Sequence, residues 1–252
     1  MLPRGGHSSD ARQLRFRVVS GPKACPSTAQ YFANRVTWML AVWGRRTSSN
    51  VQALMWGIGE LGLPYERHDA GHRSGGLDTP EFRAMNPNGT VPVLRDGQGE
   101  PLWETGAILR YLAGRYGSVS FWPPEDTARA QVDKWAEWAK INVAMNFTTP
   151  IFWRVVRTAP ANRDHAAIAQ AVENLGRFLD IAEVRLSRSE FLVSDDLTVA
   201  DIQFGHVLFR YFDIAIDRPE HPALRRYFDA LSARPAFREH VMVSYEELRV
   251  PG

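Results

Sequence analysis

Pro92 stands inside a run of strand-forming residues and constrains the fold more than any other residue of this chain. Val91, Val93 and Leu94 favour a β-strand, but a proline has no amide hydrogen and cannot donate to a strand ladder. Two interpretations fit: the Val91–Pro92 peptide bond is cis, or strand pairing stops at that point. In either case the backbone of Val91 is expected to be available for another partner, such as an extended peptide that pairs with a strand edge. An edge-strand proline that serves no ligand is the alternative.

The hydrophobic pattern after residue 37 predicts an α/β thioredoxin-like N-terminal domain with elements in the order β-α-β, α, β-hairpin, α. Gly62 and Pro64 mark the end of the first helix, and the loop at 71–76 is too rich in glycine for regular structure. The expected elements are strands at 38–43, 65–69, 91–94 and 100–103 and helices at 50–61, 79–85 and 105–116.

Two consecutive prolines, Pro123 and Pro124, mark a linker, after which only helical periods remain. The second domain is therefore expected to be an all-α helical bundle. Its helical stripes run through 126–146, 162–187, 198–213 and 222–233. The chain divides into 1–37 as a disordered leader or misassigned start, 38–117 as the thioredoxin-like domain, 118–125 as the linker and 126–252 as the helical domain.

The leader has no sustained helical or strand period. Three interpretations compete: a disordered arm, an Arg- and Ser-rich targeting peptide with few acids, or upstream sequence included by a start codon placed too early. Met39 begins the first strand-like run, so we favour the misplaced start and leave the leader out of the fold.

Composition and charge narrow the class of protein. Of the 252 residues, 44% are apolar and 23% are charged, as in ordinary soluble globular proteins. No apolar run approaches the roughly 20 residues of a membrane span, so we expect no membrane partner. Residues 39–252 hold 24 basic and 27 acidic residues, so the net charge of +2 belongs to the leader. We therefore expect no nucleic-acid partner.

Cysteine and histidine usage argues against redox and metal sites. Cys25 is the single cysteine, which excludes an intrachain disulfide and a Cys-X-X-Cys site. The seven histidines include no pair at metal-ligand spacing, so we expect no metal.

Thr198 and Asp201 have the spacing of a helix capping box, with Asp in place of the usual Glu. Asp201 also suits the positive end of the helix that follows. Because the next residues are largely apolar, we expect this helix in the core and a structural role for the pair.

Four motifs, in their order and spacing, resemble a soluble, cytosolic-type glutathione transferase over residues 39 to about 242. They are Gly44-Arg-Arg-Thr-Ser-Ser-Asn-Val51, Asn86-Pro-Asn-Gly-Thr-Val-Pro-Val-Leu94, Glu104-Thr-Gly-Ala-Ile-Leu-Arg-Tyr-Leu-Ala113 and Thr198-Val-Ala-Asp-Ile202. The resemblance implies the glutathione transferase fold, glutathione as cosubstrate and a small hydrophobic electrophile as second substrate. It also implies a role in detoxification, a homodimer and a cytoplasmic location.

The Ser48-Ser-Asn-Val51 run is similar to the serine-type, bacterial-like class, in which a serine faces the glutathione sulfur. The match implies Ser48 as the catalytic residue, with Ser49 as the alternative by a one-residue slip. A thiol with a pKa of about 8.5 is mostly protonated at pH 7, and lowering that pKa by about 2 units requires roughly 2.7 kcal/mol. A hydroxyl hydrogen bond to the sulfur, about 1.5–3 kcal/mol, and the positive end of the helix near Asn50 supply much of this. The other interpretation is that one of the two serines caps that helix.

The resemblance also implies how the rest of glutathione is held. Thr105 receives the α-carboxylate of the γ-glutamyl group at a helix N-terminus, Glu104 receives its ammonium, and the backbone of Val91 beside Pro92 pairs with the cysteinyl part. The implied set is completed by Ser49, Asn50, Thr90 and Arg73, with His72 as the alternative to Arg73 at the glycyl carboxylate.

The electrophile is expected between Ser48 and the helices at 126–153. The candidate wall is Trp138, Asn142, Met145, Phe147 and Trp153, although an aromatic stripe at helical spacing is more often core than pocket.

Other uses of the same site are glutathione-dependent isomerisation, dehalogenation or disulfide reduction. A non-catalytic protein that binds glutathione or another ligand is a further alternative. The absence of a cysteine near position 48 argues against a cysteine-type thiol transferase. Ser48, Pro92, Glu104 and Thr105 together argue against a pure scaffold.

Overall fold

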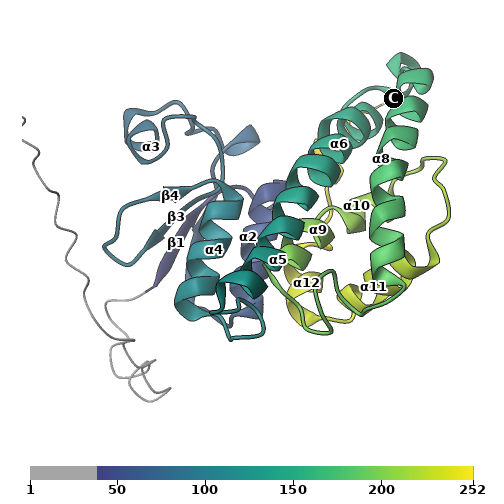
Figure 1. Ribbon diagram of the computed structural model, residues 1–252. Coiled ribbons are helices and arrows are strands. Elements are labelled where there is room, and N and C mark those ends of the chain that lie inside the picture. The colour runs from purple at the N-terminus through teal and green to yellow at the C-terminus, as the bar shows by residue number, and fades with distance from the viewer. Residues whose placement is uncertain (1–38, 252) are drawn as a thin grey trace, which may run out of the picture. The chain divides into compact units, whose positions relative to one another are not determined.

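The computed structural model describes residues 39–251 (Figure 1), so the interpretations of residues 1–37 lie outside the described residues. The strands are β1 (Leu40–Trp43), β2 (Tyr65–His68), β3 (Val93–Asp96) and β4 (Leu102–Trp103). The α-helices are α2 (Ser49–Glu60), α3 (Pro80–Met85), α4 (Thr105–Tyr116), α5 (Asp126–Trp138), α6 (Met145–Phe147), α7 (Arg154–Val156), α8 (His165–Leu186), α9 (Val199–Gly205), α10 (Leu208–Asp213), α11 (Pro222–Ser232) and α12 (Pro235–His240). Short 3-10 turns lie at His72–Ser74, Pro160–Asn162 and Glu246–Leu248.

The strands form one mixed sheet in the order β2-β1-β3-β4. β1 and β2 are parallel, with α2 as the crossover between them, whereas β3 is antiparallel to both β1 and β4. This is the predicted thioredoxin-like arrangement, followed by the predicted helical domain. β4 covers only 102–103, the second half of its expected range.

α2 joins the sheet to the helical domain. Figure 1 shows α2 and α4 side by side, and α2 contacts α4, α9 and α12. Trp56 on α2 is fully buried, and its ring lies edge-on to Phe237 with the centroids 4.8 Å apart. A Cβ on Gly205 would lie 2.9 Å from the Trp56 ring, so only glycine permits this approach of α9. One hydrophobic core therefore runs from the sheet into the helices.

The helical domain departs most from its predicted bounds in two places, and α12 was not predicted. The helix expected over 126–146 continues to Val156 through π-helical turns at Ala139–Ala144 and Thr148–Trp153. Pro150 lies in the second turn, where the wider winding accommodates a residue without an amide hydrogen. The helix expected over 198–213 is interrupted after Gly205 and resumes at Leu208.

The predicted capping box of α9 is present. Asp201 is fully buried, and its Oδ2 accepts hydrogen bonds from the Thr198 amide (2.8 Å) and hydroxyl (2.9 Å). Its Oδ1 accepts from the Leu192 amide (2.9 Å) and the Tyr227 hydroxyl (3.0 Å). These four donors hold a buried carboxylate that would otherwise be costly to desolvate.

Candidate active site

Ser48 occupies the N-cap position of α2, directly after the β1–α2 loop. Its carbonyl oxygen accepts from the Gln52 amide (2.8 Å), which starts the helix, but its hydroxyl makes no capping hydrogen bond. The side-chain cap expected from one of the two serines is therefore absent at Ser48. Because the first turn of α2 also lacks an acidic residue, its positive end is left available to an anion.

Two arginines from other elements hold the β1–α2 loop. Arg67 on β2 donates to the Gly44 carbonyl oxygen at 2.7 Å, and Arg210 on α10 donates to the Thr47 carbonyl oxygen at 2.7 Å. A Cβ on Gly44 would collide with Val51, and Gly44 has a φ of 155°, which side chains rarely adopt. The loop that positions Ser48 is thus fixed from both domains.

The Val91–Pro92 peptide bond is cis, and β3 begins only at Val93, so both interpretations of this proline hold. Val91 lies outside the β1–β3 and β3–β4 ladders. The loop before it is pinned by the buried Asn86, whose Nδ2 donates to the Thr90 carbonyl oxygen (2.9 Å) and hydroxyl (3.3 Å). Thr90 itself is exposed.

Glu104 and Thr105 mark the start of α4. Glu104 is exposed and has a φ of 67°, a left-handed conformation that costs a non-glycine residue about 1–3 kcal/mol. It makes no side-chain cap, and Thr105 begins the helix as a buried residue. The next position has no side chain: a Cβ on Gly106 would lie 2.9 Å from both Arg110 Nη1 and Gln203 Nε2, which occupy that space.

Sequence reasoning missed Lys140, which reaches this region from the helical domain. Its Nζ donates to Asn50 Oδ1 at 2.7 Å, so Asn50 already has a partner in the first turn of α2. Burial lowers the pKa of Lys140, whereas Glu104 and Glu137 favour its charged form. Lys140 does not belong to the apolar stripe expected over 126–146, so no local pattern marked it.

A cavity of about 510 Å³ lies beside the Ser48 loop and contains the predicted Arg73. It is lined by Arg45, Arg46, Thr47, Arg67, Asp69, Gly71, His72, Arg73, Ser74, Met242, Val243, Ser244 and Glu247. The cavity is thus lined by the β1–α2 loop, residues 67–74 and the C-terminal segment 242–247. The sequence analysis assigned no role to the C-terminal segment.

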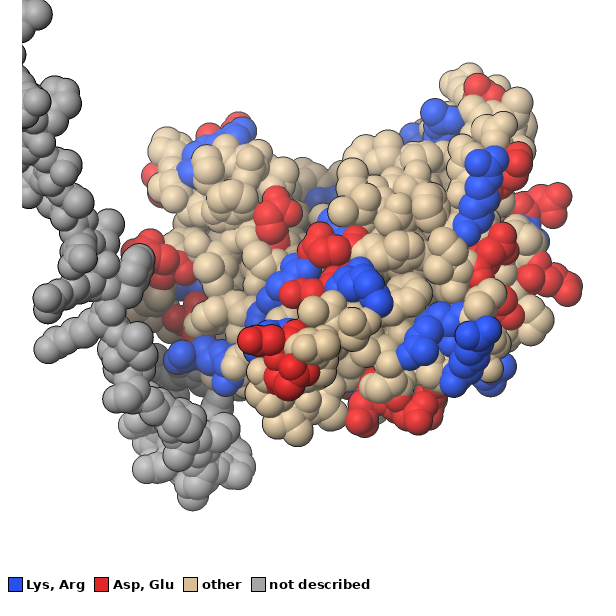
Figure 2. Space-filling view, in the orientation of Figure 1, with Lys and Arg blue, Asp and Glu red and all other residues tan. Residues whose placement is uncertain are grey.

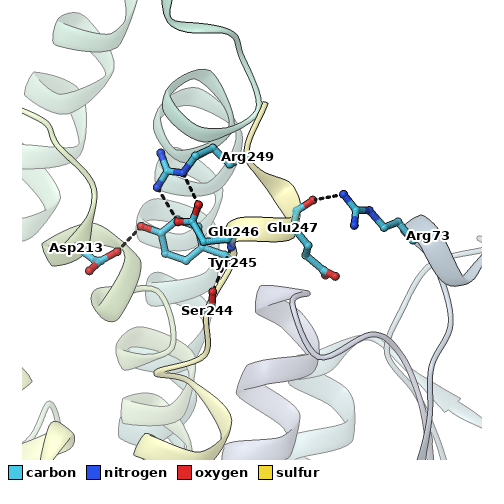
Figure 3. A network of polar contacts seen from close by, with 7 residues as sticks. All are labelled: Arg73, Asp213, Ser244, Tyr245, Glu246, Glu247 and Arg249. Atoms are coloured by element: carbon cyan, nitrogen blue, oxygen red, sulfur yellow. Dashed lines mark hydrogen bonds and ion pairs between the residues drawn. The ribbon is translucent and has the colours of Figure 1, made fainter. Parts of the chain in front are cut away.

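The C-terminal segment is tied across this cavity, as Figure 3 shows. Arg73 Nη2 donates to the Glu247 carbonyl oxygen (3.3 Å). The Thr47 hydroxyl, which Figure 3 does not draw, donates to the Glu247 carboxylate. Tyr245 donates to Asp213, and Arg249 pairs with Glu246 at 2.9 Å. Contacts between residues some 200 positions apart have no local sequence signal, which is why the segment was missed.

The predicted electrophile wall divides into buried and exposed side chains. Phe147 is buried in the core against Phe152 and Tyr211. Trp138 is partly buried and packs on Trp135 and Phe204. Met145 and Trp153 are exposed, at 61% and 42%. Asn142 donates to the Trp138 carbonyl oxygen within its own helix (3.2 Å).

Residues 39–251 contain no group of three or more His, Cys, Asp or Glu side chains placed to hold a metal ion. In the same part of the chain, no helix has the length and apolarity needed to cross a bilayer.

The sheet with its cis-proline loop and the helical second domain are the glutathione transferase fold. The profile described as glutathione S-transferase, N-terminal domain, matches residues 47–115, and the profile of the C-terminal domain matches residues 143–235. The chain therefore belongs to the glutathione S-transferase family of enzymes.

Individual relatives agree with this assignment. Glutathione S-transferase GstB of Escherichia coli K12 is 35% identical over 206 residues, which is 81% of this chain and 99% of GstB. Glutathione S-transferase 3 of Zea mays is 31% identical, over 80% of this chain and 93% of its own. A solved structure of the theta class glutathione S-transferase of Xanthomonas axonopodis pv. citri, with glutathione bound, superposes with a TM-score of 0.77 at 40% identity and covers 82% of this chain and 99% of its own.

Proposed function

We propose that the enzyme binds glutathione beside the start of α2, converts its thiol to the thiolate through the Ser48 hydroxyl, and delivers it to a hydrophobic electrophile. The observation that carries the proposal is the unused Ser48 hydroxyl at the N-terminus of α2. A hydroxyl donor and the positive helix end both stabilise the thiolate over the thiol. The hydroxyl needs no proton-accepting role in this mechanism, because it only has to donate to the sulfur.

The other predicted residues supply the rest of a glutathione site in this proposal. Val91 lies outside the ladders and has backbone groups for the cysteinyl part, with Pro92 fixing the turn. The start of α4 at Thr105 receives the γ-glutamyl carboxylate, and Glu104 receives the ammonium. Arg73 receives the glycyl carboxylate at the cavity. The set is completed by Ser49, Asn50 and Thr90.

The proposal includes a homodimer, a cytoplasmic location and a role in detoxification, as the family resemblance implies.

The thiolate can be measured directly by its ultraviolet absorbance. We expect the parent enzyme and Ser49→Ala to show bound thiolate near neutral pH, and Ser48→Ala to lose most of it while still binding glutathione. Loss in Ser49→Ala instead would move the assignment by one residue. Glutathione binding without any thiolate in the parent would contradict the mechanism and favour a binding protein.

A further inference from the structure

The cavity beside the Ser48 loop has an unbalanced set of charges. Its charged lining residues are Arg45, Arg46, Arg67, Arg73, Asp69 and Glu247. Asp69 is paired with Arg67, and Arg46 donates to the Glu239 carbonyl oxygen at 3.2 Å. Glu247 is therefore the one remaining lining carboxylate for both Arg45 and Arg73.

Arg45 is the lining cation with the fewest partners. It is partly buried, and its Nε is buried without a hydrogen-bond partner among residues 39–251. It takes part in none of the ion pairs of that part of the chain. It shares a turn with the proposed catalytic residue, since the Ser48 amide donates to the Arg45 carbonyl oxygen at 3.1 Å.

Two further arginines, Arg157 and Arg210, lie within electrostatic range of Arg45, and the three are called the arginine cluster. Burial lowers the pKa of Arg45 and Arg157 lowers it further, whereas Glu247 acts in the opposite direction. Arg210 is only 3% exposed, lies 4.6 Å from the centre of the Phe152 ring, and its Nε also lacks a partner among the described residues. Burial, and in part Arg45, lowers the pKa of Arg210 to about 10. Such a cluster favours the arrival of an anion.

Glutathione does not balance this cluster under the proposed function. Its γ-glutamyl carboxylate is assigned to Thr105 and its glycyl carboxylate to Arg73. Arg73 is exposed on the 72–74 turn, and the Arg45 guanidinium lies beside the same turn, so a single glycyl carboxylate there faces several cations. Glu247 offers one carboxylate, but it is itself exposed and extends from the C-terminal segment, so a ligand can replace it.

We propose that the cavity between the β1–α2 loop and the C-terminal segment is an anion subsite in which Arg45 binds a carboxylate of the electrophilic substrate. The inference rests on the proposed glutathione transfer and narrows its second substrate to electrophiles that carry an anionic group on an apolar body. Arg45 is a specificity-determining residue in this scheme, and Arg157 and Arg210 reinforce its field.

The reaction itself is ordinary substitution. The thiolate lone pair forms the carbon–sulfur bond, the halide leaves with the carbon–halogen bonding pair, and the thiol proton is released to solvent when the thiolate forms. The carboxylate of the acceptor stays unchanged and serves only to hold the reacting carbon near the sulfur, which raises the rate by proximity.

The test compares two acceptors of one shape, a chloronitrobenzoate and the matching chloronitrobenzamide. Each kcat/KM is divided by the uncatalysed rate with glutathione, which removes the difference in intrinsic reactivity. We expect the parent to prefer the carboxylate, and Arg45→Gln to lower that preference by about 10-fold or more, because a charge-assisted hydrogen bond is lost. Arg45→Lys should retain more of the preference for the carboxylate, because lysine keeps the positive charge but lacks the paired N–H donors of the guanidinium.

Arg188→Gln is the matched control, because Arg188 is exposed beyond α8 and lines no part of this cavity. It makes the same change in net charge and should leave the preference unchanged. If Arg45→Gln does not fold, Arg157→Gln provides a second comparison, in which the preference for the carboxylate should fall by less, because Arg157 acts on Arg45 only through its charge.

The remaining outcomes separate the two proposals. If Arg45→Gln lowers kcat/KM equally for both acceptors, the anion subsite is overturned and Arg45 has a structural role. If it raises the KM for glutathione and leaves the preference for the carboxylate unchanged, the subsite is also overturned and Arg45 is assigned to glutathione. A parent that forms the thiolate but conjugates only the amide would also overturn it. A parent enzyme that forms no thiolate would overturn the proposed function and, because the anion subsite rests on that function, the anion subsite as well.

Discussion

At the scale of single residues, His206 is a buried histidine outside the site whose surroundings shift its pKa strongly. It lies between α9 and α10 and is 1% exposed. Burial, reinforced by the charge of Lys140, lowers its pKa from 6.5 to about 3, so it is neutral in the folded protein at pH 7. In the unfolded chain the pKa of His206 returns to its ordinary value of 6.5. Below that pH the unfolded chain therefore binds a proton at His206 that the folded protein does not bind.

His206 is therefore expected to make the protein less stable in mild acid. Its contribution to stability is complete above pH 6.5 and is lost as the pH falls toward 3. The slope is about 1.4 kcal/mol of unfolding free energy per pH unit for one proton. Urea unfolding at several pH values should show a smaller slope in His206→Gln than in the parent, whatever the absolute stabilities. His165→Gln, which alters an exposed histidine, should keep the parental slope; equal slopes in all three proteins would refute the assignment.

The residues predicted from sequence and those missed differ in the distance over which they act. Ser48, Pro92 and Thr105 are marked by local patterns, a helix start or a proline among strand formers, and the structure has these elements where they were expected. Lys140 and Glu247 act on residues 90 and 200 positions away, and no local pattern encodes such contacts. Their roles required the packed chain.

At the scale of elements, α10 fixes the β1–α2 loop through Arg210. The guanidinium is buried, takes part in no ion pair of residues 39–251, and donates to the Thr47 carbonyl oxygen one residue before Ser48. A buried charge without a counterion is a poor source of stability, and an apolar side chain of similar length is often as stable. Arg210 is therefore expected to position the β1–α2 loop rather than to raise the stability of the fold.

Arg210→Met is expected to separate activity from stability. The melting temperature should change little, whereas kcat should fall by about 10-fold or more because the serine is less well placed. The pKa of bound glutathione, read from the thiolate absorbance, should rise in the variant, and Arg210→Lys should restore part of it. A loss of activity that merely follows a loss of folded protein would show that Arg210 is only structural.

The helices and strands were predictable to different degrees for a physical reason. The capping box of α9 depends on Thr198 and Asp201 alone, and it is present as expected. The continuation of α5 to Val156 was not predicted, because Pro150 normally ends a helix and is accommodated here by π-helical winding. The helix-ending signal of Pro150 was therefore overridden by the packing of the helix that contains it.

At the scale of the whole described chain, the two domains share one core and several ion pairs, and Figure 2 shows acidic and basic side chains next to one another on the surface. Glu60 on α2 accepts from Arg234 Nε (2.8 Å) and Nη2 (2.6 Å), and also from Trp56 Nε1 (2.8 Å). The Glu60 side chain is 11% exposed and that of Arg234 is 35% exposed. Such a pair is screened less than a surface pair.

Unfolding of residues 39–251 is expected to be a single cooperative transition, with tryptophan fluorescence and circular dichroism changing together. Glu60→Gln should lower the unfolding free energy by about 2 kcal/mol, because Arg234 loses its counterion across the domain contact. Glu173→Gln breaks the exposed Arg177–Glu173 pair and should cost no more than about 0.5 kcal/mol. Two separated transitions in the parent would contradict a shared core.

The clamp of Arg210 on Thr47 limits how enzymes of this design can be recombined. One domain carries the proposed catalytic serine, and the other carries the side chain that holds its loop in place. A chimaera that joins the first domain of this protein to the second domain of a relative would inherit the serine without its support unless the new partner brings an equivalent arginine. Compatibility of halves, rather than possession of the catalytic residue, would then decide which hybrids are good catalysts.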